Sequence, residues 1–254
     1  MRLVFVIFSM LFAISCAHKT VVSTERAPAQ SAIETIKPED ITIWSLQDMA
    51  RQKKFDVLND LFNNKGIKID KLPEGYAAGA AARVMGGLGG EMLDSITGNS
   101  WKGKMFFPAE NPRKSKGLNR IREGGLFGKS GAITPMASFE TELLERDPLT
   151  PEAKSNVVIL NYAKPITKGY WQEKAINSVP VYDVMVPIKG RSGTVFVGKT
   201  WIGLYEPDGS FTSQHAGVAW FFLDFNNETL RLQKEEHWDG SKEVILNPLP
   251  KVKN

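Results

Sequence analysis

The chain has 254 residues, of which 42% are hydrophobic and 24% are charged, and its formal net charge is +4. This composition is typical of a globular protein and excludes a disordered or collagen-like chain. The basic residues are spread along the sequence rather than gathered in a dense stripe, so no nucleic-acid partner is expected.

Residues 1–15 have the pattern of a secretory signal peptide. Arg2 supplies a positive charge, and residues 3–14 form an almost unbroken apolar run that is too short to span a bilayer. The segment Ala13-Ile14-Ser15-Cys16 resembles the lipobox of bacterial lipoprotein precursors. The resemblance implies that Cys16 becomes an acylated N-terminus, which anchors the protein to membrane lipid without a spanning helix. The alternative is an ordinary signal peptide that is cut near Ala17, with Cys16 removed.

The cysteine count and the residue after Cys16 bear on the compartment. Cys16 is the single cysteine of the chain, so the mature domain has no disulfide, no zinc-thiolate site and no cysteine nucleophile. The resemblance to lipoproteins implies a protein of the cell envelope that faces the periplasm. Ala17 stands where aspartate commonly retains lipoproteins at the inner membrane, which favours the outer membrane in a Gram-negative source.

Two segments precede the main domain. Residues 16–40 are polar and lack any helical or strand period, so they are expected to form a flexible tether. Residues 41–66 contain one predicted amphipathic helix over 41–62, with Ser45 as its N-cap and Asn63-Asn64-Lys65-Gly66 as its stop signal. Its mixed charges favour packing against the body of the protein over a membrane surface.

Residues 67–254 are expected to form one antiparallel β domain. Glycine, β-branched and aromatic residues cluster here, and turn signals at short intervals replace the long helices of a parallel sheet. Pro207-Asp208-Gly209 and Asn226-Asn227 are interpreted as hairpin turns, and a helix over 138–146 remains an alternative. The candidate strands are 75–84, 101–107, 132–139, 156–162, 180–187, 194–205, 218–225 and 230–234.

Two of these strands, 194–205 and 218–225, are apolar on both faces. A strand of this kind is buried on both sides. One side would face a barrel interior, and the other would be covered by the helix over 41–62 or by a partner. The sequence therefore predicts a mainly β fold, an antiparallel lipocalin-like barrel of about eight strands with an N-terminal amphipathic helix.

Short motifs in the β domain support this fold class. Trp101-Lys102-Gly103-Lys104 and Leu118-Asn119-Arg120 are followed by a strand that ends at Tyr162 and by the run Phe221-Phe222-Leu223-Asp224-Phe225. In this order they resemble a widespread group of small uncharacterised β-rich proteins. The resemblance implies a compact β domain and supplies no catalytic residues.

Charged residues within the apolar strands are expected to pair, because an unpaired buried charge is costly. We expect Lys104 or Arg120 to meet Asp183 or Asp224. The group is either the polar end of a ligand cavity or a structural ion-pair network that closes the barrel.

The candidate ligand-binding site combines these charges with aromatic residues on neighbouring strands. The same aromatic residues would equally fill a solid core. The candidate residues are Arg83, Trp101, Lys104, Asn119, Arg120, Asp183, Lys199, Trp201, Trp220, Phe222 and Asp224.

Other motifs give weaker signals. The glycine-rich run 86–90 does not match a phosphate-binding loop and is expected to be a turn. His18, His215 and His237 lack the spacing of a metal site, so no metal or cofactor is expected. The G-x-S-x-G motif of a serine hydrolase is absent, and Arg113-Lys114-Lys116 is expected to lie in a solvated loop.

The sequence favours a membrane-anchored envelope lipoprotein that is not an enzyme and that binds a small apolar or amphipathic ligand. One alternative is a structural lipoprotein with a filled core, which docks another envelope protein. A second alternative is an envelope hydrolase, which a titratable pair in a cleft near His215 or His237 would support. An interior cavity would favour the ligand-binding hypothesis, and a solid core with an exposed apolar patch would favour the structural lipoprotein that docks another protein.

Overall fold

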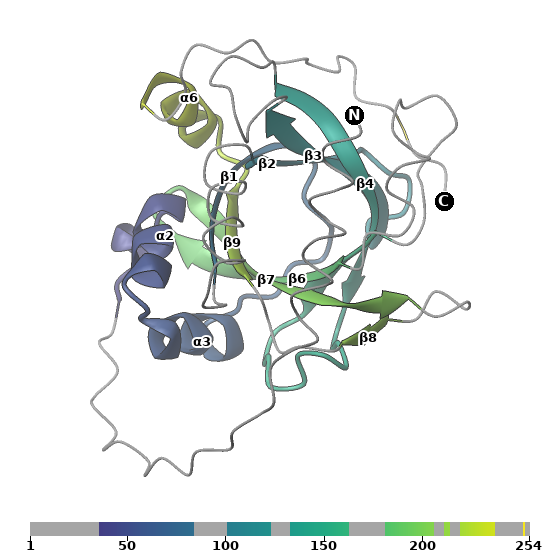
Figure 1. Ribbon diagram of the computed structural model, residues 1–254, viewed down its shortest axis with the longest axis horizontal. Helices are drawn as coiled ribbons and strands as arrows, with labels where there is room; N and C mark the ends of the chain where they lie inside the picture. Colours follow the sequence, from purple (N-terminus) through teal and green to yellow (C-terminus); the bar gives the residue numbers. More distant parts are fainter. Residues whose placement is uncertain are drawn as a thin grey trace, which may run out of the picture.

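The computed structural model describes residues 36–83, 101–122, 133–162, 181–205, 211–213, 219–236 and residue 251. Eight antiparallel strands form a closed barrel, as the sequence predicted (Figure 1). Each strand pairs with the next from β1 to β7, and β9 closes the ring between β7 and β1. The strands of the ring are β1 Gly75–Arg83, β2 Trp101–Phe106, β3 Lys114–Arg122, β4 Ile133–Leu144, β5 Val157–Asn161, β6 Val181–Gly190, β7 Gly193–Tyr205 and β9 Ala219–Asp224.

A ninth strand, β8 (Phe211–Ser213), stands outside the ring and pairs only with the end of β7 within the described residues. The register from Gly203 opposite Ser213 to Tyr205 opposite Phe211 is that of a hairpin. The predicted turn Pro207-Asp208-Gly209 falls between these two strands and lies outside the described residues.

The N-terminal helical segment consists of separate pieces rather than one helix. A short 3-10 helix, η1 (Pro38–Asp40), occupies the end of the predicted tether, and α2 (Ile43–Arg51) and α3 (Phe55–Asn64) follow. Lys53, with φ of 59°, breaks the helix between α2 and α3. The prediction of a single helix was therefore wrong, although α3 ends at the predicted stop signal.

The N-cap of α2 is Thr42, and the prediction of Ser45 was wrong by one turn. The Ser45 backbone N–H donates to Thr42 Oγ1 (3.1 Å), and the Thr42 N–H donates to Ser45 Oγ (2.9 Å). This reciprocal pair is a capping box, in which the N3 residue is a serine.

The last described element is a helix, α6 (Asn227–Glu236), where a strand over 230–234 was expected. The Asn226 side chain accepts a hydrogen bond from the Glu228 N–H (2.8 Å), and the Leu230 N–H donates to the Asn226 carbonyl (3.0 Å). Asn226 therefore caps a helix, and the interpretation of Asn226-Asn227 as a hairpin turn was wrong.

Residues 114–122 form strand β3, which the candidate strands did not include. Lys114 and Lys116 form ion pairs with Glu142 and Glu140 of β4, at 3.2 Å and 4.0 Å. The expectation of a solvated loop over Arg113-Lys114-Lys116 was therefore wrong for its two lysines. β4 runs through to Leu144, which excludes the alternative helix over 138–146.

The barrel wall is buried on both faces, as predicted for β7 and β9. Inside the barrel, Phe196, Phe221 and Leu223 pack with side chains from the other strands. On the outside, α2 and α3 cover the wall beside β9 and β7 (Figure 1). The hydrophobic core is thus divided into an inner cluster and an outer cluster beneath the helices.

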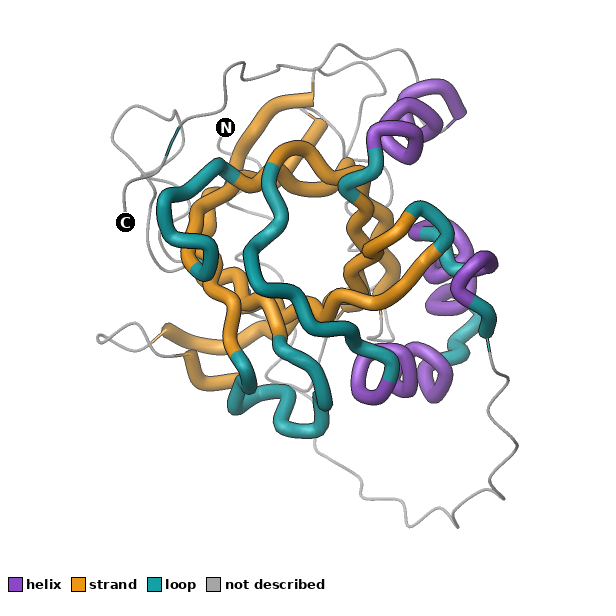
Figure 2. The backbone as a smooth tube through the Cα atoms, turned by 180° about the vertical axis from the view of Figure 1, so that it is seen from behind, coloured by secondary structure: helices purple, strands orange, loops and turns teal. Residues whose placement is uncertain are grey.

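One end of the barrel is closed by residues 66–74, which we call the plug. This segment runs from α3 across the end of the barrel to β1 (Figure 2), and Ile69 and Leu72 pack into the inner cluster. Its backbone is fixed by hydrogen bonds from the Ile67 N–H to the Pro187 carbonyl (2.8 Å) and from the Leu72 N–H to the Pro112 carbonyl (2.7 Å). We call the opposite end, where β1 ends and β2 begins, the far end.

Candidate functional site

Lys104 lies inside the barrel on β2, opposite Ala77 of β1 and Asn119 of β3. The register of β2 shifts between Trp101 and Lys104, where Gly103 has a φ of 117°. The resulting bulge directs both Trp101 and Lys104 toward the interior. Strict alternation along a strand would place Trp101 on the opposite face from Lys104, and the bulge removes this alternation.

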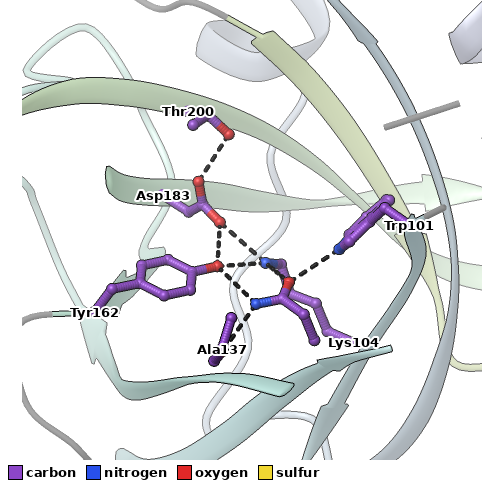
Figure 3. A network of polar contacts seen from close by, with 7 residues as sticks. Trp101, Lys104, Ala137, Tyr162, Asp183 and Thr200 are labelled. Atoms are coloured by element: carbon purple, nitrogen blue, oxygen red, sulfur yellow. Dashed lines mark hydrogen bonds and ion pairs between the residues drawn. The ribbon is translucent and has the colours of Figure 1, made fainter. Parts of the chain in front are cut away.

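The ammonium group of Lys104 donates to three protein oxygens (Figure 3). They are Asn119 Oδ1 at 2.7 Å, Tyr162 OH at 2.6 Å and Asp183 Oδ2 at 3.0 Å. The ion pair between Lys104 and Asp183 is one of the pairs that the sequence predicted. We call these four residues, together with Trp101 and Thr200, the lysine network.

Asp183 is held in place from two further directions. Tyr162 OH donates to its Oδ2 (2.8 Å), and Thr200 Oγ1 donates to its Oδ1 (2.7 Å). Thr200 lies directly opposite Asp183 because β6 and β7 form a hairpin whose register pairs Gly190 with Gly193. Both carboxylate oxygens therefore accept hydrogen bonds, so neither oxygen of this buried group lacks a partner.

Asn119 connects Lys104 to the wall of the barrel. Its Oδ1 also accepts from Trp101 Nε1 (2.9 Å), and its Nδ2 donates to the Ala137 carbonyl (2.9 Å). Ala137 has a φ of 53° and is the extra residue where the pairing of β3 with β4 shifts register. The bulge offers a backbone carbonyl to a side chain rather than to the neighbouring strand.

Aromatic rings, in addition to the three oxygen atoms, surround the ammonium group of Lys104. Lys104 Nζ lies 5.2–5.5 Å from the ring centroids of Trp101, Phe139, Tyr162 and Phe221, which is within the range of cation–π attraction. Burial lowers the pKa of Lys104, and the charge of Asp183 and its hydrogen bond oppose this shift. The amine is therefore easier to deprotonate than a solvated lysine.

The inward-facing side chains differ in their solvent exposure. Phe106, Phe139 and Met185 are fully buried on the plug side, and Phe106 and Phe139 stack edge to face at 5.3 Å. Trp101, Val181 and Thr200, which face inward nearer the far end, are only half-buried. Ile69 of the plug and Phe225, which follows β9, are half-buried as well, so the fully buried layer lies between the plug and the lysine network.

Arg120 faces the outside of the barrel and does not join the lysine network. Its NH1 donates to the carbonyls of Ala77 (2.7 Å) and Lys102 (2.9 Å), and it contacts Gln233 Oε1 at 3.4 Å. Gln233 Nε2 in turn donates to the Gly79 carbonyl (2.9 Å). Arg120 therefore fixes α6 against the barrel wall, and its expected role in the ligand site was wrong.

Asp224 is also on the outside, at the start of α6. It accepts hydrogen bonds from Ser192 Oγ, from the Asn226 N–H (2.9 Å) and from Thr229 Oγ1 (2.7 Å). These contacts tie the turn between β6 and β7 to the beginning of the helix. Asp224 is thus a structural residue, and it does not pair with Lys104 or Arg120 in any contact described here.

The other aromatic candidates face outward as well. Trp201, Trp220 and Phe222 belong to the outer cluster beneath the helices. Lys199 lies over the rings of Phe62 and Trp220, at 4.4 Å and 4.9 Å. The prediction that these four candidates share a cavity with Lys104 was therefore wrong, since the barrel wall separates them from it.

The remaining candidates have no described side chain. Arg83 is the last residue of β1, opposite Ala219, and its side chain is not among those described. His18, His215, His237 and the glycine-rich run 86–90 lie outside the described residues. In the described ranges, no three histidine, cysteine or acidic residues gather in a group that could hold a metal ion.

Tyr162 and Thr200 complete the lysine network but were not among the candidate residues. Counting back from the glycines of the β6–β7 turn would have found Thr200, because that register places it opposite Asp183. Tyr162 follows directly after β5, and nothing in the local sequence distinguishes it from the aromatic residues of a core.

Comparisons with known proteins found no relative: no protein-family model, no curated protein and no solved structure matches this chain. Within the described ranges, none of the helices combines the length and the apolar character that crossing a membrane requires.

Proposed function

We propose that this protein is a membrane-anchored envelope lipoprotein that binds a small apolar or amphipathic molecule in its barrel, at the far end. The single observation that supports this most is the half-burial of Trp101, Val181 and Thr200, whose side chains face inward. Side chains that line a barrel interior and still meet solvent are accessible to a guest molecule.

The lysine network would form the floor of this site. Thr200 and Tyr162 offer hydroxyl groups, Lys104 offers a positive charge, and Trp101 offers an indole face. A guest with an apolar body and one polar group would place that group toward Lys104 and its body along Trp101. Below the network, the fully buried Phe106 and Phe139 leave the plug half as a packed support.

A structural lipoprotein that docks another envelope protein is the second candidate. It is favoured by the fact that Lys104 already donates to three protein oxygens, as expected for a network that only closes the barrel. In that case the half-buried side chains at the far end bind no guest molecule, and the barrel is a scaffold with a filled core.

The anchor is a separate part of the proposal. It is supported by the lipobox-like segment at Cys16 and by the polar residues that follow it. Acyl chains on Cys16 would hold the protein at a membrane, with the barrel in the aqueous phase, and we favour the outer membrane.

Native mass spectrometry of the protein extracted from its own host tests the binding function. A co-purifying small molecule is the expected result. Titration with a fluorescent fatty-acid probe then compares two matched variants, Trp101→Leu on the inside and Trp201→Leu on the outside. We expect about tenfold weaker binding for Trp101→Leu, the loss of about 1.4 kcal/mol of contact, and no change for Trp201→Leu.

Two results would contradict the binding function. The first is the absence of any bound molecule together with no uptake of the probe by the full chain. The second is an equal loss of probe affinity in both variants, which would mean that the loss reflects a less stable protein rather than a binding site inside the barrel.

A further inference from the structure

We propose that the amine of Lys104 captures a carbonyl guest covalently, as an imine, so that the preferred ligand of the barrel is an apolar aldehyde. This inference rests on the proposed function, since the guest must first enter the far end. It goes beyond that function by naming the chemical class of the guest and the atom that holds it.

The position of Nζ supports this assignment. The side chain of Lys104 is 3% exposed and extends into the interior, where its tip meets Asn119, Tyr162 and Asp183. Thr200, which is bonded to the same carboxylate, is half-buried. Asp183 thus links the reactive nitrogen to Thr200, a side chain that solvent reaches. The hydrogen bonds of the nitrogen also fix its direction.

The neighbours of Nζ can carry out the proton transfers that imine formation needs. Asp183 takes one proton from the ammonium group, and the freed electron pair of nitrogen attacks the carbonyl carbon to form a C–N bond. The carbonyl oxygen takes one proton from the attacking nitrogen and becomes a hydroxyl, which then takes the proton held by Asp183 and leaves as water when the C=N bond forms. The sum is one ammonium ion and one aldehyde giving one protonated imine and one water, with no oxidant or reductant.

Asp183 also suits the product of this reaction. A protonated imine keeps the positive charge on nitrogen, so the carboxylate at 3.0 Å stays paired with a cation before and after capture. The hydrogen bonds from Tyr162 and Thr200 hold both carboxylate oxygens in place throughout. The ion pair is therefore present before and after capture, and both groups are neutral while Asp183 holds the proton, so an uncompensated buried charge is avoided.

The aromatic rings around the nitrogen define the guest further. Trp101, Phe139, Tyr162 and Phe221 lie around Nζ, and their faces favour a planar conjugated or apolar body next to the carbonyl. Burial lowers the pKa of Lys104, so a larger share of this amine is neutral and nucleophilic than in a solvated lysine.

Reductive trapping tests the inference on the full chain. The protein is incubated with cinnamaldehyde and borohydride, and the modified lysines are mapped by peptide mass spectrometry. We expect on the order of tenfold more adduct at Lys104 than at exposed lysines such as Lys53, because a guest bound in the barrel holds its carbonyl beside this amine, and we expect urea to abolish this preference. Lys104→Arg should remove the preferred adduct, whereas the matched Lys199→Arg outside the barrel should retain it.

Cinnamyl alcohol, which has the same body and no carbonyl, separates the two proposals. Binding of both compounds with no preference for Lys104 would overturn the imine and leave the proposed function standing. Failure of both compounds to bind, with adducts spread evenly over exposed lysines, would overturn the imine and count against the proposed function as well. If Lys104→Arg does not fold, the distribution of adducts over the lysines of the unmodified chain still tests the imine.

Discussion

The Nζ atom of Lys104 lies 3.0 Å from Oδ2 of Asp183, and the two side chains are 3% and 4% exposed. They come from β2 and β6, which are four strands apart in either direction around the ring. The ion pair therefore crosses the interior and joins opposite walls of the barrel.

Breaking the buried pair should destabilise the fold strongly. We expect Lys104→Met or Asp183→Asn alone to lower the free energy of unfolding by about 3–5 kcal/mol, because each leaves the other group unpaired. The double variant should lose less than the sum of the single losses, since it leaves no orphaned charge. Urea denaturation of the four proteins measures this coupling.

The exposed pair of Lys114 and Glu142, 3.2 Å apart, is the matched control. Lys114→Met should cost only about 0–1 kcal/mol, as surface ion pairs do. Equal losses for Lys104→Met and Lys114→Met would mean that the pair inside the barrel has no special role in stability.

Gly103 should tolerate no side chain. Its φ is 117°, and an added Cβ would collide with the backbone carbonyl of Ala77. Gly193 has nearly the same φ, 115°, with open space around the Cβ position. We expect Gly103→Ala to cost about 1–3 kcal/mol more than Gly193→Ala, the usual cost of overpacking. Thermal or urea unfolding compares the two, and equal losses would show that backbone strain alone matters at Gly103.

Lys199 should make stability depend on pH. Burial lowers its pKa below the ordinary value of 10.5, so the unfolded chain binds this proton more tightly than the folded protein. Between the lowered pKa and 10.5 the free energy of unfolding should therefore rise with pH. Below the lowered pKa both states are protonated, and the contribution is constant.

The variant Lys199→Met lacks this dependence and keeps the contact with Phe62 and Trp220. Urea unfolding at a series of pH values up to 10.5 should therefore show its stability falling behind that of the unmodified protein as pH rises. The exposed Lys65→Met controls for the loss of one positive charge. Parallel curves for the unmodified protein and Lys199→Met would refute the assignment.

Cys16→Ser should release the protein from the membrane. Without a thiol at this position no acyl chain can be attached, and the polar residues that follow provide no other anchor. Fractionation of host cells should move the variant to the soluble fraction, whereas Ser15→Ala, which keeps a small residue before the cysteine, should remain with the membrane. Unchanged fractionation of Cys16→Ser would show that acylation there does not anchor the protein.

Most of the barrel could be predicted from the sequence because its strands carry strong β signals. The apolar strands β7 and β9 were found within a residue or two of their ends. β3 was missed because its first residues, Lys114-Ser115-Lys116-Gly117, are polar and contain a glycine. The two lysines are stabilised there by glutamates of β4, a cross-strand effect that local propensity does not report.

The helix α6 shows the opposite error. Thr229, Leu230, Arg231, Leu232 and Gln233 alternate between polar and apolar, as a strand does. A helix forms because Asn226 caps it and because Gln233 is drawn to the barrel wall by Gly79 and Arg120. Tertiary contacts decided between two patterns that a short segment could not separate.

The candidate site was predicted only in part, for a related reason. Pairing of Lys104 with Asp183 follows from the cost of buried charge, and it was among the expected pairs. The sequence does not show which apolar face of β7 or β9 turns inward, because both faces are buried: α2 and α3 cover the outer one. Trp201, Trp220 and Phe222 were therefore assigned to the wrong side of the wall.

The N-terminal segment leaves the barrel from its plug end. Arg191, in the turn between β6 and β7, donates from its backbone N–H to the Ile41 carbonyl (2.9 Å) and from its Nε to the Glu39 carbonyl (2.6 Å). The proposed anchor at Cys16 would thus be linked to the described domain at the end opposite the one where Trp101 and Thr200 meet solvent.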